Sequence, residues 1–283
     1  MKKKIIEFLG FFTLRVCIYL VLAILIIFLY DIGSKGAEAI NWEFLTQAPR
    51  RGMTAGGIFP AIMGTFLVTM VTAILAVPMG MFAAIYLNEY AHQTRITRFI
   101  RLSIRNLSGV PSIVYGLFGV ILFVNVLKFG TSILSAGLTL GLLTLPWTIT
   151  ASEEALKTIP NTYREGALAL GATKWQAIRT NVLPYALPGM LTGTVLGLAR
   201  AAGETAPIMF TGAAFYLPFL PRSLTDQFMA LPYHLYVMAT QHHAISQVRP
   251  LAYGTALVLI ILILFMNLTA IIIRSHLRRI KKE

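Results

Sequence analysis

The sequence predicts an all-α integral membrane protein, and two observations support this prediction. Apolar residues make up 57% of the 283-residue chain and charged residues only 12%, which lies outside the usual range of soluble globular domains. The apolar residues also gather into segments long enough to cross a hydrocarbon core, which takes about 20 helical residues. We therefore expect six transmembrane helices, near residues 11–30, 58–87, 107–128, 131–151, 186–211 and 251–273.

The first apolar segment has some features of a secretory signal peptide, because three lysines precede it and Ala37-Glu38-Ala39 resembles a cleavage site. Its apolar stretch is longer than the roughly 7–15 residues of a signal core, and the cleavage-like triplet lies well beyond its end. We expect a retained anchor. The chain then divides into an anchor helix with an outer loop (1–57), a transmembrane domain (58–273) and a basic tail (274–283).

The basic residues predict the orientation in the membrane, because Lys and Arg near the ends of spans are held on the cytoplasmic side. With the N-terminus inside, the cytoplasmic segments hold most of the 24 Lys and Arg residues. Both termini and the loop 152–185 are then cytoplasmic. The net charge of +13 is spread over these span ends, which argues against a nucleic-acid-binding face.

The loop 152–185 is polar and lies between two membrane-length segments. Gly171 is suited to end a short helix, and Thr173 with Gln176 predicts a capping box that opens the next one. We therefore expect two short helices on the cytoplasmic face. The chain contains no G-x-x-x-x-G-K-[ST] phosphate loop, so it is not expected to hydrolyse ATP by that route.

The fifth segment carries Arg200 and Glu204, which would lie one turn apart on one face of a helix. A charge at membrane depth costs about 2.5–3.5 kcal/mol even on the lenient insertion scale, so we expect the two to pair and to face a protein or aqueous interior. Gly203 and Pro207 should weaken the helix beside them. The pair could line a transport path, or could serve only as a structural ion pair.

The same segment has a stripe of small residues that should let a neighbouring helix approach closely. The stripe consists of Gly189, Gly193, Gly197 and Ala201.

The start of the third segment is a second candidate for anion contact. Pro111 suits a first helical turn, so Ser108, Ser112 and the free amide groups there could meet an anion. The alternative is that Ser and Gly residues at this point only allow close helix packing.

The remaining residues give no pattern for catalysis or metal binding. The single cysteine, Cys17, excludes a disulfide framework, and the five histidines are divided between the two sides of the membrane. We expect no metal site and no catalytic cluster. Residues 212–250, rich in aromatics and prolines, are expected to form an interfacial or re-entrant outer segment.

The loop 152–185 resembles the E-A-A-x-x-x-G-x9-I-x-L-P loop of permease subunits in ATP-binding-cassette importers. The matching residues are Glu165-Gly166-Ala167, Gly171 and Leu183-Pro184, with Gly166 in place of Ala and Asn181 in place of Ile. The resemblance implies that these residues form a coupling helix that docks into a separate cytoplasmic ATPase, which would hold the ATP and Mg²⁺. No cofactor is expected on this chain.

Two further stretches resemble the permeases of phosphate-specific importers: G-V-P-S-I-V-Y-G-L-F-G from Gly109 and A-R-A-A-G-E-T-A-P-I-M-F-T-G from Ala199. The outer segment is similar to that of the A-type subunit. The resemblance implies a type I importer fold in a bacterial inner membrane and a phosphate path formed in part by Arg200, Glu204, Thr205 and Ser112. The implied partners are a second homologous permease, two ATP-binding subunits and an extracytoplasmic phosphate-binding protein.

Three other functions remain open from the sequence. A permease for another oxyanion, such as molybdate or sulfate, would keep the coupling loop. A secondary transporter or channel would need no ATPase. An integral membrane enzyme would need a catalytic cluster.

Overall fold

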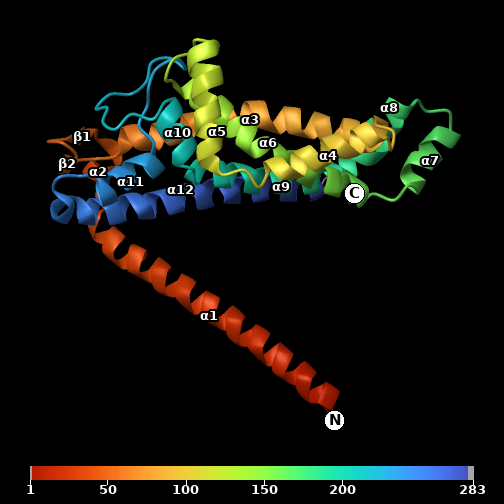
Figure 1. Ribbon diagram of the computed structural model, residues 1–283, viewed down its shortest axis with the longest axis horizontal. Helices are drawn as coiled ribbons and strands as arrows, with labels where there is room; N and C mark the ends of the chain where they lie inside the picture. The colour runs from red at the N-terminus through yellow and green to blue at the C-terminus, as the bar shows by residue number, and fades with distance from the viewer. Residues whose placement is uncertain (1, 280–283) are drawn as a thin grey trace.

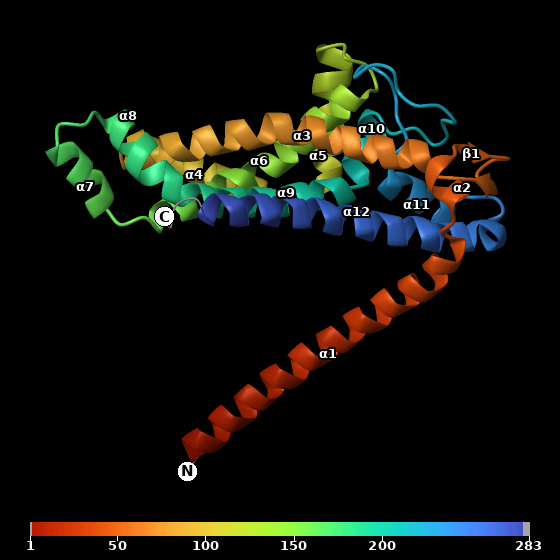
Figure 2. The same ribbon diagram turned by 180° about the vertical axis from the view of Figure 1, so that it is seen from behind.

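The computed structural model describes residues 2–279, which are mainly helical. Four long helices lie side by side in a bundle, and one helix leaves it at an angle (Figures 1 and 2). One end of the bundle carries a small antiparallel hairpin, and we call it the hairpin end; the opposite end carries α7 and α8, and we call it the loop end. The bundle helices are α3 (Phe59–Ile85), α6 (Ile133–Lys157), α9 (Leu183–Gly203) and α12 (Ile245–Arg279), and the hairpin strands are β1 (Pro49–Arg50) and β2 (Ala55–Gly56).

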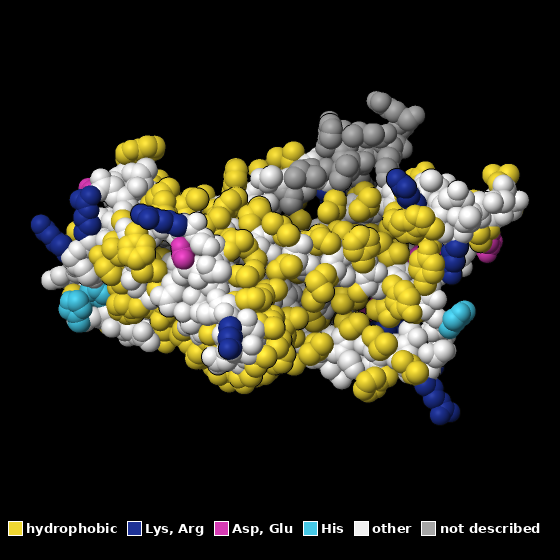
Figure 3. Space-filling view, turned by 90° about the horizontal axis from the view of Figure 1, so that it is seen from above, with side chains coloured by type: hydrophobic (Ala, Val, Ile, Leu, Met, Phe, Trp, Pro, Cys, Tyr) yellow, Lys and Arg dark blue, Asp and Glu magenta, His cyan; other side chains and the backbone are white. Residues whose placement is uncertain are grey.

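Hydrophobic side chains cover most of the face in Figure 3, and Lys and Arg gather mainly toward the two ends. Within residues 2–279, five helices are long and apolar enough to cross a membrane, and a bent helix pair makes a sixth candidate. The number of expected spans is therefore met only if the bent pair counts as one.

The helix predicted near 107–128 is present but begins only at Ser112, and the bend lies just before it. α4 (Arg95–Leu107) is followed by a break and then by α5 (Ser112–Gly119) with the π-helical turn η2 (Val120–Val126), at 103° to α4. Pro111 lies directly before α5, rather than in its first turn as predicted. Proline disfavours a helical backbone in the residue before it, so the chain turns here and α5 projects across the bundle (Figure 1).

The helix that leaves the bundle is α1 (Lys2–Ala39). Its last turns pack on α12, where Gly36 lies against the carbonyl of Tyr253 and the side chain of Leu257. Its N-terminal part and the end of α12 both extend toward the loop end (Figure 2). α12 continues through Arg279, so the predicted basic tail begins as helix, and residues 280–283 of that tail lie outside the described residues.

α6 and α9 pack closely along the predicted small-residue stripe. At these positions a side chain on α9 would overlap α6, so glycine sets the distance between the two helices. The prediction that the stripe admits a neighbouring helix is confirmed by three glycines: Gly189 lies against Ala155, Gly193 against Ala151 and Gly197 against Thr144.

We expect Gly193→Val to lower the free energy of unfolding by about 2 kcal/mol, because the added side chain must push α6 away. Thermal unfolding of the purified protein in detergent would measure the change. Gly141→Ala on α6 is the matched control, since a methyl group there meets open space. Equal unfolding temperatures for wild type and Gly193→Val would contradict this account of the stripe.

The segment 212–250 folds over the hairpin end of the bundle. Residues 228–231 are fully buried, and Phe228 pairs with Ala213 in a parallel bridge. The short helix α11 (Leu231–Thr240) follows, and the Leu231 amide donates to the Thr65 hydroxyl of α3 at 2.8 Å. Another short helix, α2 (Trp42–Thr46), places the buried Phe44 in one apolar cluster with Met229 and Leu231. The aromatic and proline-rich segment thus closes the hairpin end.

α11 buries a neutral histidine. The His234 side chain is 2% exposed, and its Nδ1 has no hydrogen-bond partner among the described residues. Burial, with a smaller contribution from nearby His242, lowers the pKa of His234 to about 4 from 6.5. His242 in turn accepts a hydrogen bond from the Ala244 amide on Nδ1, so its Nε2 donates to the Gly52 carbonyl at 2.6 Å. The closed hairpin end therefore contains a histidine, His234, that folding keeps uncharged.

Because the folded chain resists protonation of His234, the unfolded chain binds the extra proton between pH 6.5 and 4. Stability from this residue is complete above about pH 6.5 and is lost as the pH falls toward 4. At about 1.4 kcal/mol per pKa unit the loss approaches about 3 kcal/mol. Thermal unfolding from pH 7.5 to 4 should show this slope in wild type and in a variant of exposed His243, His243→Phe, but not in His234→Phe. The same slope in His234→Phe would contradict the assignment.

Candidate functional site

The loop 152–185 forms the two short helices that were predicted. They are α7 (Thr162–Ala169) and α8 (Lys174–Ala177), and α8 continues into the π-helical turn η3 (Ile178–Val182) before α9. Gly171 has a φ of +85°. Its amide donates to the Leu168 carbonyl at 3.0 Å, and the Ala172 amide donates to the Ala167 carbonyl at 3.1 Å. This is a Schellman motif, which ends α7 with a left-handed residue as predicted.

The predicted capping box is also present. The Thr173 amide donates to the Gln176 side chain at 2.8 Å, and the Gln176 amide donates to the Thr173 hydroxyl at 3.3 Å. The end of α7 and the start of α8 are thus each fixed by local hydrogen bonds, with only residues 170–173 between the two helices. The angle between the two helices is set by this short connection.

The predicted coupling residues divide into two groups. Glu165, Gly166 and Gly171 are exposed at the loop end. Ala167 is buried, while Leu183 packs against the apolar cluster at the ends of α3 and α6 and the adjacent Pro184 begins α9. The first group can contact a partner, whereas the second group holds the loop in place.

Sequence reasoning missed the apolar surface of the loop. Leu170 is 91% exposed at the C-terminus of α7, and Tyr163 and Trp175 are also exposed. Large apolar side chains at the end of a polar loop are typical of a surface that a partner covers. A leucine next to the predicted turn glycine would have been the signal.

The second candidate site lies where α9 stops. α9 ends at Gly203, Glu204 has an extended backbone (φ −72°, ψ 134°), and the short helix α10 (Ala206–Thr211) follows with Pro207 in its first turn. The expected weakening by Gly203 and Pro207 is therefore a complete break. Glu204 lies just beyond the helix rather than on its face, which corrects the predicted spacing.

Arg200 and Glu204 form the predicted ion pair at this break. Arg200 Nε lies 3.4 Å from Glu204 Oε1, and the guanidinium lies 5.2 Å from the ring centroid of Trp147 on α6. The Arg200 side chain is 48% exposed and that of Glu204 is 15% exposed. This chain therefore does not enclose Arg200, and the expected interior position requires another molecule to cover it.

Ser112 begins α5, and Thr205 lies directly before α10. Gly116 of α5 lies against Pro207 of α10, and Gly119 lies against Thr211. The residue numbers increase together along both helices, so α5 and α10 run parallel, and α10 starts at the α9 break. The Ser108 hydroxyl, in contrast, donates to the Arg105 carbonyl at 2.6 Å and is already occupied within its own turn.

The two groups of candidate residues are therefore far apart along the bundle. Arg200 lies 17 residues after Leu183 on α9, or roughly 26 Å at 1.5 Å per residue. Within residues 2–279, no group of three or more His, Cys, Asp or Glu side chains could hold a metal ion.

Comparison with known proteins decides the family. Residues 76–282 match the model of the family described as binding-protein-dependent transport system inner membrane component. The chain belongs to this family. Its members are membrane components of transport systems, and the break in α9 and the loop at α7 and α8 both lie within the matched region. The expected membrane transport subunit, as opposed to an enzyme, is confirmed.

Curated relatives in this transport family cover most of the chain. The probable ABC transporter permease protein YqgI of Bacillus subtilis is 30% identical over 95% of this chain and 95% of its own. The phosphate transport system permease protein PstA 1 of Mycobacterium tuberculosis is 38% identical over 78% of this chain and 71% of its own. That of Haemophilus influenzae, PstA, is 30% identical over 88% and 86%. The resemblance to importer permeases is confirmed.

Solved structures confirm the predicted type I importer fold. A chain of a bacterial ABC transporter involved in the import of alginate superposes with a TM-score of 0.62 at 15% identity, covering 93% of this chain and 96% of that chain. A chain of the methionine ABC transporter MetNI, in an inward-facing conformation, superposes with a TM-score of 0.59 at 19% identity, covering 78% and 94%.

Proposed function

We propose that this chain is the membrane permease subunit of an ATP-driven importer of inorganic phosphate. The relatives named as phosphate transport permeases support the choice of cargo. The observation that carries the proposal is the Arg200–Glu204 pair at the broken end of α9. An arginine partly neutralised by a carboxylate attracts an anion without holding it tightly, and a conduit needs release as well as binding.

The path would lie on the exposed side of Arg200. Glu204 and Thr205 lie in the break, and the parallel helices α5 and α10 point their positive N-terminal ends in the same direction, an orientation that favours anions. Ser112 at the start of α5 completes the set. A related second permease would cover Arg200 and supply the other half of the path. Bacillus subtilis has two such relatives, YqgI and YqgH.

The exposed face of α7 and α8 would dock a cytoplasmic ATP-binding subunit through Glu165, Gly166 and Gly171, with Leu170 beside them. Two such subunits would hold the ATP and Mg²⁺, and no cofactor would bind to this chain. A phosphate-binding protein would deliver cargo at the hairpin end. Glu165 and Leu170 are both exposed and offer one charged and one large apolar contact.

We infer a bacterial inner-membrane location with both termini and the loop end in the cytoplasm. The charge distribution supports this orientation, and α1 and α12 both extend toward the loop end. Residues 1–57 would serve as the anchor and outer loop, 58–273 as the transport domain and 274–283 as the basic tail.

In vesicles whose ATP-binding subunits face the lumen, the purified complex should accumulate phosphate only under two conditions. ATP must be present in the lumen, and the phosphate-loaded binding protein must be present outside. Uptake should withstand excess sulfate and molybdate. ATP-dependent uptake of sulfate or molybdate in place of phosphate would show that phosphate is not the cargo. Phosphate uptake without the ATP-binding subunits would show that ATP is not the energy source.

A further inference from the structure

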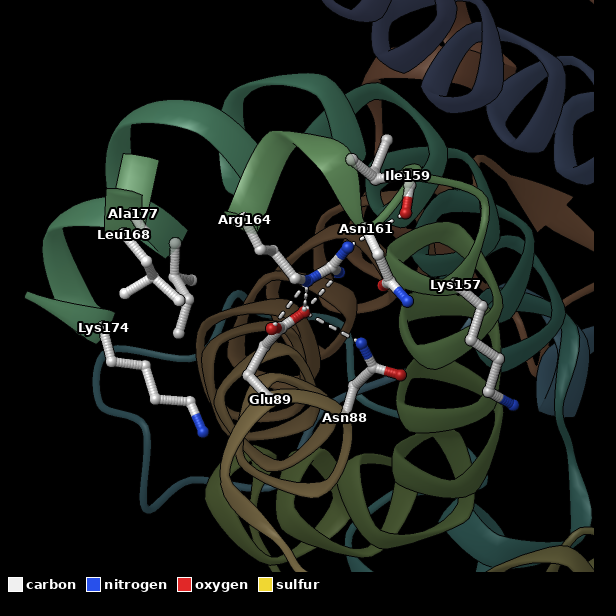
Figure 4. A pocket seen from close by; sticks show the side chains of 10 residues that line it. Asn88, Glu89, Lys157, Ile159, Asn161, Arg164, Leu168, Lys174 and Ala177 are labelled. Atoms are coloured by element: carbon white, nitrogen blue, oxygen red, sulfur yellow. Dashed lines mark hydrogen bonds and ion pairs between the residues drawn. The ribbon is translucent and has the colours of Figure 1, made fainter. Parts of the chain in front are cut away.

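We propose that Arg164 and Glu89 form the link that makes the coupling loop and the membrane helices move as one body. This inference rests on the proposed function, because it assigns two positioning residues to ATP-driven transport. Arg164 is the third residue of α7, and Glu89 lies in η1 (Tyr86–Tyr90), the π-helical turn that ends the α3 span. Figure 4 shows the two side chains pointing toward one another.

The two side chains meet as a fork. Arg164 Nη2 donates to Glu89 Oε1 at 2.6 Å and Nε donates to Oε2 at 3.0 Å. The Arg164 side chain is 17% exposed and that of Glu89 only 5%. Asn88 Nδ2 donates to the same carboxylate at 2.9 Å. A shielded bidentate pair is geometrically specific and weakly screened by salt, so it fixes α7 relative to the end of α3.

The same guanidinium also holds the end of α6. Nη1 donates to the Ile159 carbonyl at 2.9 Å, and Nη2 reaches the Leu156 carbonyl at 3.3 Å. The last carbonyls of a helix have no partner inside it. Arg164 therefore joins three elements through one planar group, and a lysine ammonium could not match this fork geometry.

A second arginine fixes η1 from the other side. Arg101 of α4 donates to the Leu87 carbonyl at 2.6 Å and to Glu153 of α6 at 3.1 Å. At the end of the loop, Ile178 and Val182 of η3 are buried in one apolar cluster with residues from the ends of α3 and α6. The loop is therefore bound to the membrane helices at its beginning, through Arg164, and at its end, through η3. A displacement of α7 would move α3, α6 and α9 together.

A nearby ion pair on the surface, between Lys157 and Glu154, provides a comparison with the Arg164–Glu89 pair. Lys157 lies 2.7 Å from Glu154, but both side chains are exposed and both belong to α6. This pair joins no second element. Glu154→Gln is therefore the matched control for Glu89→Gln, since both changes remove one carboxylate near the same end of the bundle.

The test uses the complete complex in vesicles and measures the phosphate transported per ATP hydrolysed. We expect Glu89→Gln and Arg164→Lys to lower this ratio by about 10- to 100-fold, because a small misplacement of a remote element has effects of that size. ATP hydrolysis and the recovery of the ATPase subunit should persist, and Glu154→Gln should match wild type. A wild-type ratio in both Arg164→Lys and Glu89→Gln would overturn the link.

Two additions separate the link from folding and from the proposed function. The double variant Glu89→Gln with Arg164→Gln leaves no unpaired buried charge, so it should assemble and yet remain uncoupled; normal coupling there would also overturn the link. Hydrogen exchange of α7 amides should be about ten-fold faster in both single variants than in wild type, whatever the cargo. Unchanged exchange would reject the link, whereas a wild-type complex that transports no phosphate would reject only the proposed function.

Discussion

Arg200→Ala should lower ATP-dependent phosphate uptake by about 100-fold while the complex still assembles. The loss of a charged group that contacts a desolvated anion costs roughly 2–5 kcal/mol, and each 1.4 kcal/mol is a factor of ten. Arg200 contacts this chain through one 3.4 Å pair and one ring face, and its side chain is 48% exposed. Its removal should therefore disturb the path much more than the fold.

Uptake by reconstituted vesicles and co-purification of the partner subunits would measure the two effects separately. Arg200→Lys should retain much of the uptake, because a lysine can also pair with Glu204 and attract an anion. Arg249→Ala removes an exposed arginine near the start of α12 and should have no effect on uptake. Normal phosphate uptake in Arg200→Ala would exclude Arg200 from the path.

Gly171→Val should uncouple ATP hydrolysis from transport. At a φ of +85° a β-branched residue is a severe outlier, since its side chain crowds the following carbonyl. A side chain at Gly171 would meet no other atoms within 4 Å, so the strain lies entirely in the backbone. We expect α7 to end differently and phosphate transported per ATP to fall by about ten-fold or more.

Gly171→Asn separates backbone strain from side-chain bulk. Asparagine is close to valine in size but tolerates the left-handed conformation, so this variant should keep most of the coupling. The two variants would be compared in the same vesicles, by phosphate uptake and ATP hydrolysis. Equal losses in both would mean that docking space, rather than the turn, is what Gly171 provides.

The fold was predictable where one local property decides it. The length of each apolar run indicated the long helices, and Gly203 with Pro207 indicated a weak point in α9. The direction of the chain after Pro111 was not predictable, because the composition of the segment 112–126 is the same whether it continues straight from α4 or lies at 103° to it. The contacts of Gly116 with α10 and of Gly119 with Thr139 of α6 decide that direction.

The same distinction applies to the functional residues. Gly171, Thr173 and Gln176 act through neighbours a few residues away, so the sequence indicated the turn and the capping box. Glu89 and Arg164 are 75 residues apart, and no periodicity joins them. In the sequence, Arg164 is only one of several basic residues in the loop 152–185. Its carbonyl and carboxylate partners became visible only when α3, α6 and α7 were placed together.

The contact between Gly36 and Tyr253 has a consequence for how the protein is made. It joins the first helix to the last, so this contact can form only after α12 has been synthesised. Helices that insert separately and associate afterwards are the general rule in membranes. For this chain the association of the last helix also closes the contact with the first, and a product truncated before α12 would lack the surface on which the last turns of α1 pack.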